Sequence, residues 1–454
     1  MLIRFVIENL FSFGERKEFT TIPNNRLKTL LDHKYNINGF DVLKLSSIYG
    51  ANGAGKSNLF KSLYLFQKLI TKEEIPFSLK NSQFKFFKNK DLKQVFAIEF
   101  IQDKTAFYYG IELLNSMIVT EELYKSGLGN SEDKLIFERK TSTDGKTSIN
   151  FMKEFEEDEK SQVLKSVLLE EFVKSDEPVL KLLSNRDNKY LKNIKKAFDW
   201  FDNTLQIITP DAKPRALAHR IDTDSGFKKY AEDMMCSFNL GINSLSSEKK
   251  EIKEFFGEDN ENELDELIKK VEDSPKKMIG LRSRKGDEII IVKENEKIWV
   301  KTLKVEHLGE NKSSVLFDLE EESDGTVRLL DFVPAFKSLI SEEKVYLIDE
   351  IERSIHPLLI KELIKKFSLN SNTKGQLIFT THESNLLDQE LFRQDEIWFA
   401  EKDNNGSTDL YSLSDFKEHK TTDIRKGYLN GRYGSIPFLG NLKDLNWQMY
   451  DFNK

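Results

Sequence analysis

A glycine-rich turn between two regular elements is the strongest constraint on the fold of this chain. Residues 50–57 read G-A-N-G-A-G-K-S and follow the apolar run 45–49. The pattern GxxxxGK[ST] between a strand and a helix is typical of a phosphate-binding loop, because its glycines let backbone N–H groups turn inward toward an anion. Residues 58–66 can continue as a helix whose positive end faces the same anion. The sequence therefore predicts a strand–loop–helix unit that binds a nucleoside triphosphate.

Two side chains of this loop carry charge and metal chemistry. Lys56 places a positive charge on the β- and γ-phosphates, and the Ser57 hydroxyl can ligate Mg²⁺. ATP and Mg²⁺ are therefore the expected cofactors, and Lys56 is expected to take part in catalysis. The residues predicted to bind the nucleotide here are Gly50, Asn52, Gly53, Ala54, Gly55, Lys56, Ser57 and Asn58.

The composition bounds the class of protein. The 454 residues carry a formal net charge of −7 and include one cysteine. A weakly acidic chain gives no sign of a generally basic, nucleic-acid-coating surface, and a single cysteine excludes an intrachain disulfide framework. No apolar run reaches the length of a membrane span, so we expect a cytoplasmic protein without a membrane partner.

The order of apolar patterns predicts an α/β fold in three parts. Residues 1–150 hold the loop and several alternating segments, which we expect to form the N-terminal half of the core with an antiparallel β-layer. Residues 151–275 are rich in Glu and Lys, with apolar residues at helical spacing, which predicts a helical insertion. Strand and helix patterns alternate again over residues 276–454, the expected C-terminal half of the core.

An acidic pair follows a second apolar strand. Residues 345–348 read V-Y-L-I and are followed by Asp349 and Glu350. Ligands of α/β sheets lie at the carboxyl ends of the strands. Asp349 is therefore expected to hold Mg²⁺, and Glu350 to act as the general base that polarises the attacking water. The alternative is that the two carboxylates simply begin a surface loop.

Two further segments could reach the same ligand. Residues 376–381 form a third strand pattern that ends at His382, which can contact a γ-phosphate or position the water; a histidine at a strand end is more often structural. The segment E-S-D-G-T at 322–326 precedes a predicted helix, and a Ser-x-Gly turn at a helix N-terminus can bind an anion. The alternative for this turn is an ordinary helix cap.

With these elements in order, the chain resembles the ABC-type ATPases of the SMC/RecF class. The resemblance implies an ABC-type P-loop ATPase head, in which two protomers sandwich ATP as a homodimer or a higher homo-oligomer. It also implies that Ser323, Gly325 and Thr326 contact the γ-phosphate held by the other protomer. The turn departs from the family's LSGGQ pattern, since Glu322, Asp324 and Thr326 replace Leu, the first Gly and Gln.

Longer segments resemble the small ATPases of bacterial antiphage systems, of the RloA/AbiLi, AriA and PtuA kinds. The matching segments are E-S-D-G-T-x-R-L-L at 322–330, D-E-I-E-R-S-I-H-P at 349–357, F-T-T-H-E-S-N-L-L at 379–387, Q-D-E-I-W-F at 394–399 and Y-L-x-G-R-Y-G-S-I-P at 428–437. The resemblance implies an ATPase that controls an effector protein, a nuclease or another toxin. It places Glu352, Arg353 and His356 in a D-loop against the second protomer, with helix capping as the alternative for His356.

A different class of function stays open. A DNA repair or recombination ATPase would bind DNA through a basic groove. The candidates for such a groove are Lys276, Lys277, Arg282, Arg284 and Lys285, and a solvated loop is the other interpretation of them. The segment after His382 is too short for an acidic nuclease domain, so no intrinsic nuclease activity is expected.

Four polar residues near predicted strand ends receive no assignment. Gln94 and Gln102 flank a strand of the β-layer, and neither is identified as a Q-loop glutamine. Asn9 and Ser12 resemble a strand-turn near the nucleotide, although such residues more often simply make a turn.

Overall fold

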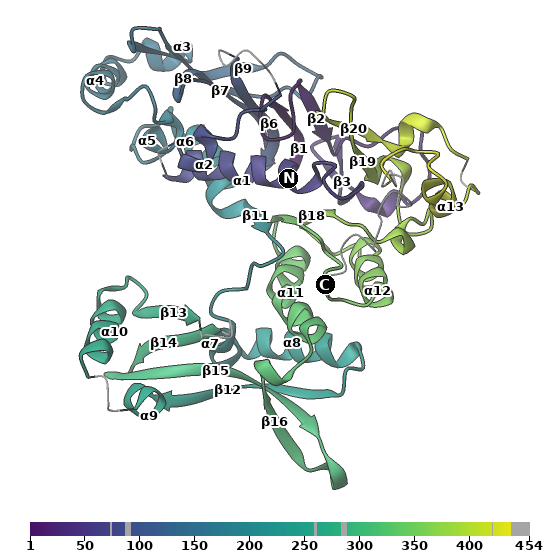
Figure 1. The fold of residues 1–454 in the computed structure, drawn as a ribbon. Coiled ribbons are helices and arrows are strands. Elements are labelled where there is room, and N and C mark those ends of the chain that lie inside the picture. The colour runs from purple at the N-terminus through teal and green to yellow at the C-terminus, as the bar shows by residue number, and fades with distance from the viewer. Residues whose placement is uncertain (73–74, 87–91, 258–260, 283–287, 420, 437–454) are drawn as a thin grey trace, which may run out of the picture. The chain divides into compact units, whose positions relative to one another are not determined.

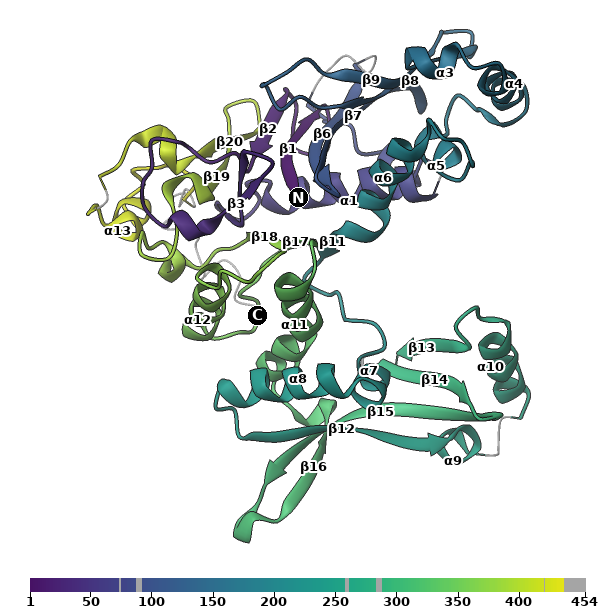
Figure 2. The same cartoon turned by 180° about the vertical axis from the view of Figure 1, so that it is seen from behind.

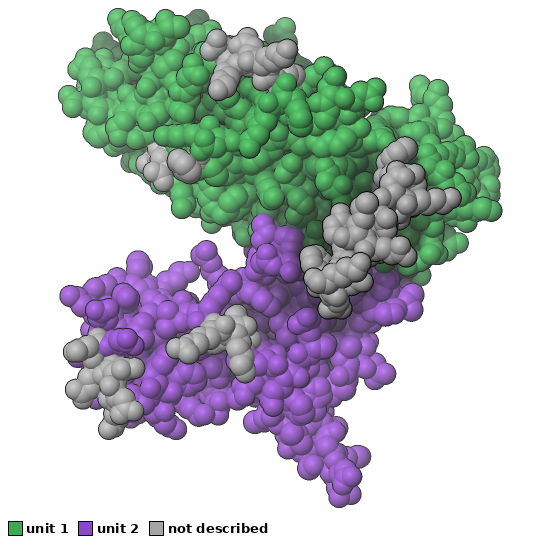
Figure 3. Space-filling view, viewed as in Figure 1, with its two compact units in different colours: residues 1–208, 343–351, 364–454 green, residues 209–342, 352–363 purple. Residues whose placement is uncertain are grey.

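The computed structural model describes residues 1–72, 75–86, 92–257, 261–282, 288–419 and 421–436. The chain divides into two units (Figure 3). Unit 1 comprises residues 1–208, 343–351 and 364–454, and unit 2 comprises residues 209–342 and 352–363.

Unit 1 is built on a six-stranded sheet with the strand order β11-β17-β18-β5-β19-β20. Strands β11, β18, β19 and β20 of this sheet are labelled in Figure 1. All neighbours run parallel except β20, which is antiparallel to β19. The strands are β5 (Leu45–Tyr49), β11 (Leu205–Ile208), β17 (Val345–Ile348), β18 (Gln376–Thr380), β19 (Ile397–Lys402) and β20 (Thr408–Ser412). The carboxyl ends of β5, β17 and β18 lie at one edge of this sheet, so the predicted loop, carboxylates and histidine follow strands that end together.

A seven-stranded antiparallel sheet forms the second layer, in the order β10-β9-β8-β7-β6-β1-β2. Its strands are β1 (Leu2–Glu8), β2 (Lys17–Thr20), β6 (Gln94–Gln102), β7 (Thr105–Leu114), β8 (Met117–Lys125), β9 (Lys134–Thr141) and β10 (Thr147–Phe151). A separate hairpin joins β3 (Lys34–Ile37) to β4 (Phe40–Leu43). The predicted α/β class with an antiparallel β-layer is confirmed.

Helix α1 (Lys56–Lys72) lies between the two sheets of unit 1 (Figures 1 and 2). Phe66 on its buried face stacks on Phe96 of β6, with the ring centroids 4.8 Å apart. Trp200 stacks on Phe100 of the same strand at 4.4 Å. Aromatic rings contribute a large apolar area to a core, so the helix that begins at the glycine-rich loop is held firmly from the side of the β-layer.

The other helices of unit 1 are short. They are α2 (Phe77–Lys80), α3 (Lys153–Glu156), α4 (Glu159–Val167), α5 (Val179–Ser184), α6 (Lys192–Asp199) and α13 (Ile424–Leu429), while α12 (Pro357–Ser368) begins in unit 2 and ends in unit 1. A buried carboxylate fixes the start of α5, because Glu121 of β8 accepts hydrogen bonds from the backbone N–H groups of Val179 and Leu180. Arg139 of β9 pairs with the same carboxylate at 3.3 Å.

Unit 2 has a five-stranded sheet of its own, with the order β12-β15-β14-β13 and with β16 paired to β15. Its strands are β12 (Ile242–Glu251), β13 (Met278–Arg282), β14 (Glu288–Glu294), β15 (Lys297–Leu308) and β16 (Ser314–Asp318). Its helices are α7 (Leu217–Thr223), α8 (Ser225–Ser237), α9 (Ile252–Phe256), α10 (Glu261–Asp273) and α11 (Asp324–Ser341). Within the described parts of both units, no helix is long and apolar enough to cross a membrane.

The predicted limits of the helical insertion, residues 151–275, are wrong. Residues 205–208 form β11 and pair in parallel with β17, so they belong to the core sheet. Residues 242–251 form a strand although four of its ten residues are Lys or Glu. Three of these four side chains form ion pairs with neighbouring strands, and Lys249 Nζ lies 2.6 Å from a carboxylate oxygen of β14. The separate unit therefore contains a sheet as well as helices.

Gln376 ties the antiparallel layer to the parallel sheet. Its side-chain oxygen accepts a hydrogen bond from the N–H of Leu2 at 2.7 Å. Its amide nitrogen donates to the carbonyl oxygens of Leu2 at 3.0 Å and Leu43 at 2.9 Å. The side chain is fully buried. If it were removed, water could not take over its hydrogen bonds to these backbone groups.

Replacing this glutamine should cost stability. In Gln376→Leu, three backbone groups lose their buried partner, and we expect the free energy of unfolding to fall by about 2–4 kcal/mol. Denaturant unfolding followed by circular dichroism measures the change. The matched control is Gln83→Leu, a half-buried glutamine, which should change stability by less than about 0.5 kcal/mol. Equal effects of the two substitutions would contradict the bridging role.

Candidate active site

The turn between β5 and α1 encloses the side chain of Lys56, the first residue of α1. Lys56 is buried, and its Nζ donates to the carbonyl oxygens of Gly50 at 2.8 Å and Ala51 at 3.2 Å. Gly53 and Gly55 have φ angles of +78° and +111°, which residues with a Cβ rarely adopt. The loop therefore carries a positive charge at its centre, next to the first turn of α1.

Exposure varies along the residues predicted to bind the nucleotide. Asn52 and Gly53 are exposed at the tip of the loop, and Ala54 is buried beneath it. Ser57 and Asn58 are half-buried on the first turn of α1. Backbone and hydroxyl groups of the loop thus remain accessible to a ligand while its base is packed.

Two segments distant in sequence brace the loop. A Cβ on Gly55 would collide with the side chains of Thr408 and Ser12, so this close approach requires glycine. Thr408 Oγ1 donates to the carbonyl of Ala54 at 2.8 Å, and Asn58 Nδ2 donates to Ser12 Oγ at 2.9 Å. The sequence left Ser12 without a role and gave no sign of Thr408, because nothing in the pattern of either segment brings β20 to the loop.

A buried carboxylate joins three elements at the edge of the sheet. Asp349 directly follows β17, is 5% exposed, and donates its backbone N–H to the carbonyl of Ile208 at 2.9 Å. Its Oδ1 accepts hydrogen bonds from Ser57 Oγ at 3.1 Å and from Thr380 Oγ1 at 2.5 Å. The structure thus brings together the two residues predicted to hold Mg²⁺, and it adds Thr380, which the sequence did not single out.

Glu350 lies at a sharp backbone turn beside this carboxylate. Its φ is +52°, a left-handed conformation that non-glycine residues adopt at a cost. Its N–H donates to Thr380 Oγ1 at 2.8 Å, so one hydroxyl contacts both Asp349 and the turn. The Glu350 side chain is half-buried and lies at the same edge of the sheet as the loop.

His382 lies within electrostatic range of the loop. Partial burial of the ring and the positive charge of Lys56 both lower the pKa of His382, and the carboxylate of Asp349 acts in the opposite direction. A lowered pKa keeps the imidazole neutral near pH 7, with one nitrogen able to donate and one able to accept. The ring remains exposed to solvent and is therefore accessible to a ligand.

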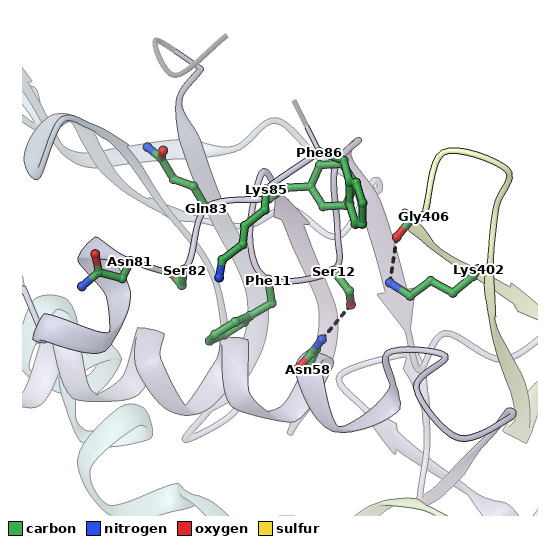
Figure 4. A pocket seen from close by; sticks show the side chains of 11 residues that line it. Phe11, Ser12, Asn58, Asn81, Ser82, Gln83, Lys85, Phe86, Lys402 and Gly406 are labelled. Carbon is green, nitrogen blue, oxygen red and sulfur yellow. Dashed lines mark hydrogen bonds between the residues drawn. The ribbon is translucent and has the colours of Figure 1, made fainter. Parts of the chain in front are cut away.

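A pocket of about 260 Å³ opens beside the first turn of α1 (Figure 4). It combines aromatic, amide and lysine side chains from four segments of unit 1. Its lining residues are Phe11, Ser12, Asn58, Asn81, Ser82, Gln83, Phe84, Lys85, Phe86, Lys402 and Gly406. Lys402 Nζ donates to the carbonyl of Gly406 at 2.8 Å, and burial lowers the pKa of this lysine. Apart from Asn58, sequence reasoning assigned none of these residues to a site.

The predicted Ser-Gly turn lies in unit 2, at the start of α11. Ser323 is the N-cap residue, and its Oγ accepts a hydrogen bond from the N–H of Thr326 at 3.1 Å. A Cβ on Gly325 would lie 2.6 Å from the carbonyl oxygen of Ser354, so the turn can approach this segment only with glycine. Ser323 is exposed and Thr326 is buried. The capping alternative is thus present in the structure, and it leaves the Ser323 side chain at the surface.

Two of the residues predicted for the D-loop have structural partners. Arg353 pairs with Asp211 at 2.7 Å within unit 2. His356 Nδ1 accepts a hydrogen bond from the N–H of Leu358 at 3.3 Å, as the capping alternative for this histidine expects.

The two glutamines left without a role also have partners. Gln94 Nε2 donates to Ser82 Oγ at 3.3 Å, and Gln102 Oε1 accepts from Thr204 Oγ1 at 2.9 Å. Both glutamines therefore join segments of unit 1 to the β-layer.

The basic residues proposed for a DNA groove surround β13 of unit 2. Lys276, Lys277 and Arg282 are exposed. Lys277 Nζ donates to the carbonyl of Glu272 on α10. Arg284 and Lys285 lie outside the described residues.

Residues 45–388 match the model of the family described as "AAA domain, putative AbiEii toxin, Type IV TA system". None of the curated proteins compared with this chain matches it.

Solved structures similar to this chain include three SMC heads, each 11% identical in sequence. An SMC head bound to the C-winged helix domain of ScpA has a TM-score of 0.41, with coverage of 90% of this chain and 97% of that one. The SMC head domain from Thermotoga maritima has a TM-score of 0.38, with coverage of 90% and 98%. An Smc head with an extended coiled coil, bound to the C-terminal domain of ScpA and derived from Pyrococcus furiosus, has a TM-score of 0.40, with coverage of 92% and 99%.

The charges around His382 give a prediction with two opposite signs. Lys56→Met removes a nearby positive charge and should raise the pKa of His382, while Asp349→Asn removes a negative charge and should lower it. Histidine-selective NMR titration measures both, with His382→Asn identifying the resonance. Lys192→Met, an exposed lysine on α6 that is not among the charges acting on His382, is the matched control and should leave its pKa unchanged. Shifts of the same sign in both charge variants would refute this arrangement.

Proposed function

We propose a function from one premise, that this chain belongs to the family described as "AAA domain, putative AbiEii toxin, Type IV TA system". The protein is then an ATPase that binds ATP with Mg²⁺ and hydrolyses it to ADP and phosphate. One observation carries the proposal: Lys56, Ser57, Asp349 and His382 stand around a single glycine-rich loop at the carboxyl edge of a parallel sheet.

The residues at the loop fit a magnesium ion. Mg²⁺ prefers oxygen ligands and is usually held by one or two protein groups together with phosphates and water. Ser57 Oγ and Asp349 Oδ1, 3.1 Å apart, are the oxygens that would hold it. When bound, Mg²⁺ would neutralise charge on the β- and γ-phosphates. The carboxylate already accepts from two hydroxyls, so its orientation is set before the ligand arrives.

The side chains of the loop and of the strand ends would have different roles in hydrolysis. Lys56 would leave its carbonyl partners and donate to the β- and γ-phosphates. Glu350, fixed by its N–H to Thr380, would accept a hydrogen bond from the attacking water and orient it. His382, neutral because its pKa is lowered, would donate to the γ-phosphate from the neighbouring strand.

The pocket beside α1 supplies a place for the nucleobase. Its aromatic rings, including Phe11 and Phe86, offer apolar faces, and stacking of a base on such a ring contributes about 1–3 kcal/mol. Asn58 lines the pocket and also follows the loop directly. Phosphates at the loop and a base in this pocket would therefore lie at the two ends of one continuous site in unit 1.

Glu350→Gln should separate binding from hydrolysis. The amide cannot accept a proton, so we expect kcat to fall about 10²–10⁴-fold while ATP still binds. Phosphate release measures turnover, and fluorescent-nucleotide titration measures binding. Lys56→Ala is the comparison variant, and it should lose nucleotide binding or hydrolysis with the positive charge of the loop. Turnover by Glu350→Gln at the wild-type rate would refute the assignment of the base.

Closure of two protomers around ATP is the second part of the proposal. Ser323 is exposed at the N-terminus of α11, an 18-residue helix whose dipole favours an anion there. In the SMC/RecF-like arrangement that the chain resembles, this serine and Gly325 would complete the site of the partner protomer. Thr326, which is buried, would hold the Ser323 hydroxyl in place through their 2.9 Å contact.

Ser323→Arg tests this closure. A long charged side chain at the tip of α11 would obstruct a second protomer, and the loop in unit 1 would be unaffected. We expect ATP affinity within about threefold of wild type and no ATP-dependent dimer in sedimentation velocity, measured in the Glu350→Gln background to slow hydrolysis. The matched control is Ser341→Arg, at the opposite end of the same helix, which should dimerise normally. An ATP-dependent dimer of the Ser323 variant would argue against the sandwich.

Control of an effector protein is the third part of the proposal. The resemblance to antiphage ATPases supports it, and the family's description names a toxin. We therefore infer that ATP-driven closure in the cytoplasm changes how the protein holds a nuclease or another toxin, without nuclease activity of its own. DNA binding through the basic residues near β13 is the alternative.

A further inference from the structure

A hairpin in unit 2 leaves one strand edge open. Strand β16 follows β15 through the turn at residues 309–313 and projects beyond the rest of the unit 2 sheet (Figures 1 and 2). The same projection is visible at the purple tip of the space-filling view (Figure 3). In the described part of the chain, β16 pairs with β15 alone. Such an edge can accept a further strand.

The hydrogen-bond pattern shows which groups face outward. The N–H of Gly309 donates to the carbonyl of Ser313 at 2.8 Å, so the backbone groups of residue 313 face β15. Backbone direction alternates along a strand, and Val315 and Phe317 therefore face β15 as well. The N–H and C=O groups of Ser314 and Leu316 then point away from the hairpin.

The chain closes this edge at one end by itself. The N–H of Asp318 also points outward, and it donates to Glu321 Oε2 at 2.8 Å as part of a capping box. The open edge is therefore short and centred on Leu316. A five-residue strand offers enough backbone groups to align a peptide, so selectivity must come from the side chains around it.

Apolar side chains surround the open edge. Leu316 is 58% exposed, Leu308 is 51% exposed and Val315 is 41% exposed. Phe317, behind them, packs edge-on against His307 with the ring centroids 4.8 Å apart. An added strand beside β16 would cover part of the exposed Leu316 and Val315 side chains, and burial of apolar surface favours binding. The edge thus offers hydrophobic burial together with backbone hydrogen bonds.

The charges near the hairpin select the partner. Residues 304–324 contain seven carboxylates and two lysines; they are Glu306, Glu310, Asp318, Glu320, Glu321, Glu322 and Asp324, against Lys304 and Lys312. Lys304 already pairs with Asp318 at 2.6 Å. Pairing of this edge with a second copy of itself would bring two acidic segments together, and nucleic acid would be repelled. A basic segment would be attracted.

We propose that β16 binds an extended segment of a partner protein, which adds a strand at Leu316 and carries Lys or Arg on both sides of alternating apolar residues. This inference rests on the proposed function only in identifying that partner with the effector. The strand ends five residues before Ser323, and His307 of β15 contacts Glu322 at 2.6 Å. The docking edge is therefore joined directly to the turn proposed to complete the ATP sandwich.

A peptide with this pattern tests the proposal on the intact protein without nucleotide. The probe is fluorescein-labelled Lys-Arg-Val-Thr-Val-Thr-Val-Arg-Lys, and its twin carries Glu and Asp in place of Lys and Arg. We expect saturable binding of the basic peptide by anisotropy with a Kd below about 0.2 mM, weakening with salt, and at least about tenfold weaker binding of the acidic twin. No saturable binding, or equal binding of both peptides, would overturn the proposal.

Substitutions at Leu316 distinguish peptide binding through the backbone of β16 from non-specific electrostatic attraction. Leu316→Pro removes the outward N–H and leaves the ladder to β15 intact, so affinity should fall at least about tenfold. Leu316→Val keeps both the N–H and an apolar side chain and is the matched control, with affinity within about threefold. Circular dichroism checks that both variants fold. As a second measurement, hydrogen exchange at the Leu316 amide should slow when the peptide binds to wild type.

Further outcomes would show that a different molecule binds the β16 edge, or that β16 is not the docking site. A nucleotide-free dimer of wild type that disappears in Leu316→Pro would show a second copy at the edge and overturn the choice of partner. Lys56→Ala should bind the peptide as wild type does, because the glycine-rich loop is not part of the β16 edge. The peptide assay therefore tests the docking edge even if the ATPase assignment fails. Unchanged peptide binding by Leu316→Pro would show that β16 is not the docking site.

Discussion

The site depends on one buried carboxylate that joins elements from distant parts of the chain. Asp349 accepts hydrogen bonds from Ser57 on α1 and from Thr380 at the end of β18. A carboxylate taken out of water needs such donors, because its desolvation costs several kcal/mol. The same two contacts set the separation between the loop and the strand edge. The atoms that satisfy this buried charge are therefore the same ones that we propose to hold the metal ion.

The β-layer and the parallel sheet together hold that arrangement in place. Gln376 bridges the two sheets through two backbone groups of Leu2 and also bonds Leu43 of the β3–β4 hairpin. Phe66 packs α1 against the β-layer. Thr408 and Ser12 support the loop from below. The carbonyl oxygens of Gly50 and Ala51 hold Lys56 Nζ inside the loop. The two sheets hold these elements in place, and the residues that we propose for hydrolysis lie at the edge of the parallel sheet.

The second half of the proposed site stands on a different unit. Ser323 caps α11 in unit 2, and the segment just before it is a hairpin with an open edge and an acidic surround. In the proposed closure, Ser323 of unit 2 would complete the nucleotide site of a second protomer, whose glycine-rich loop belongs to unit 1. Contact between Glu322 and His307 connects the turn to the hairpin, so a partner bound at β16 and a nucleotide bound at the sandwich would act on neighbouring residues.

The sequence by itself determined the loop, the strands that lead into Asp349 and His382, and the alternating β-layer, because each follows from local spacing and periodicity. It failed at β12, where lysines and glutamates look solvated until the neighbouring strands that pair with them are known. Thr380, Thr408 and the pocket beside α1 were decided only by the tertiary structure. Their roles depend on contacts between residues that are far apart in the sequence. The residues next to a threonine in a strand do not indicate which carboxylate or carbonyl its hydroxyl will contact.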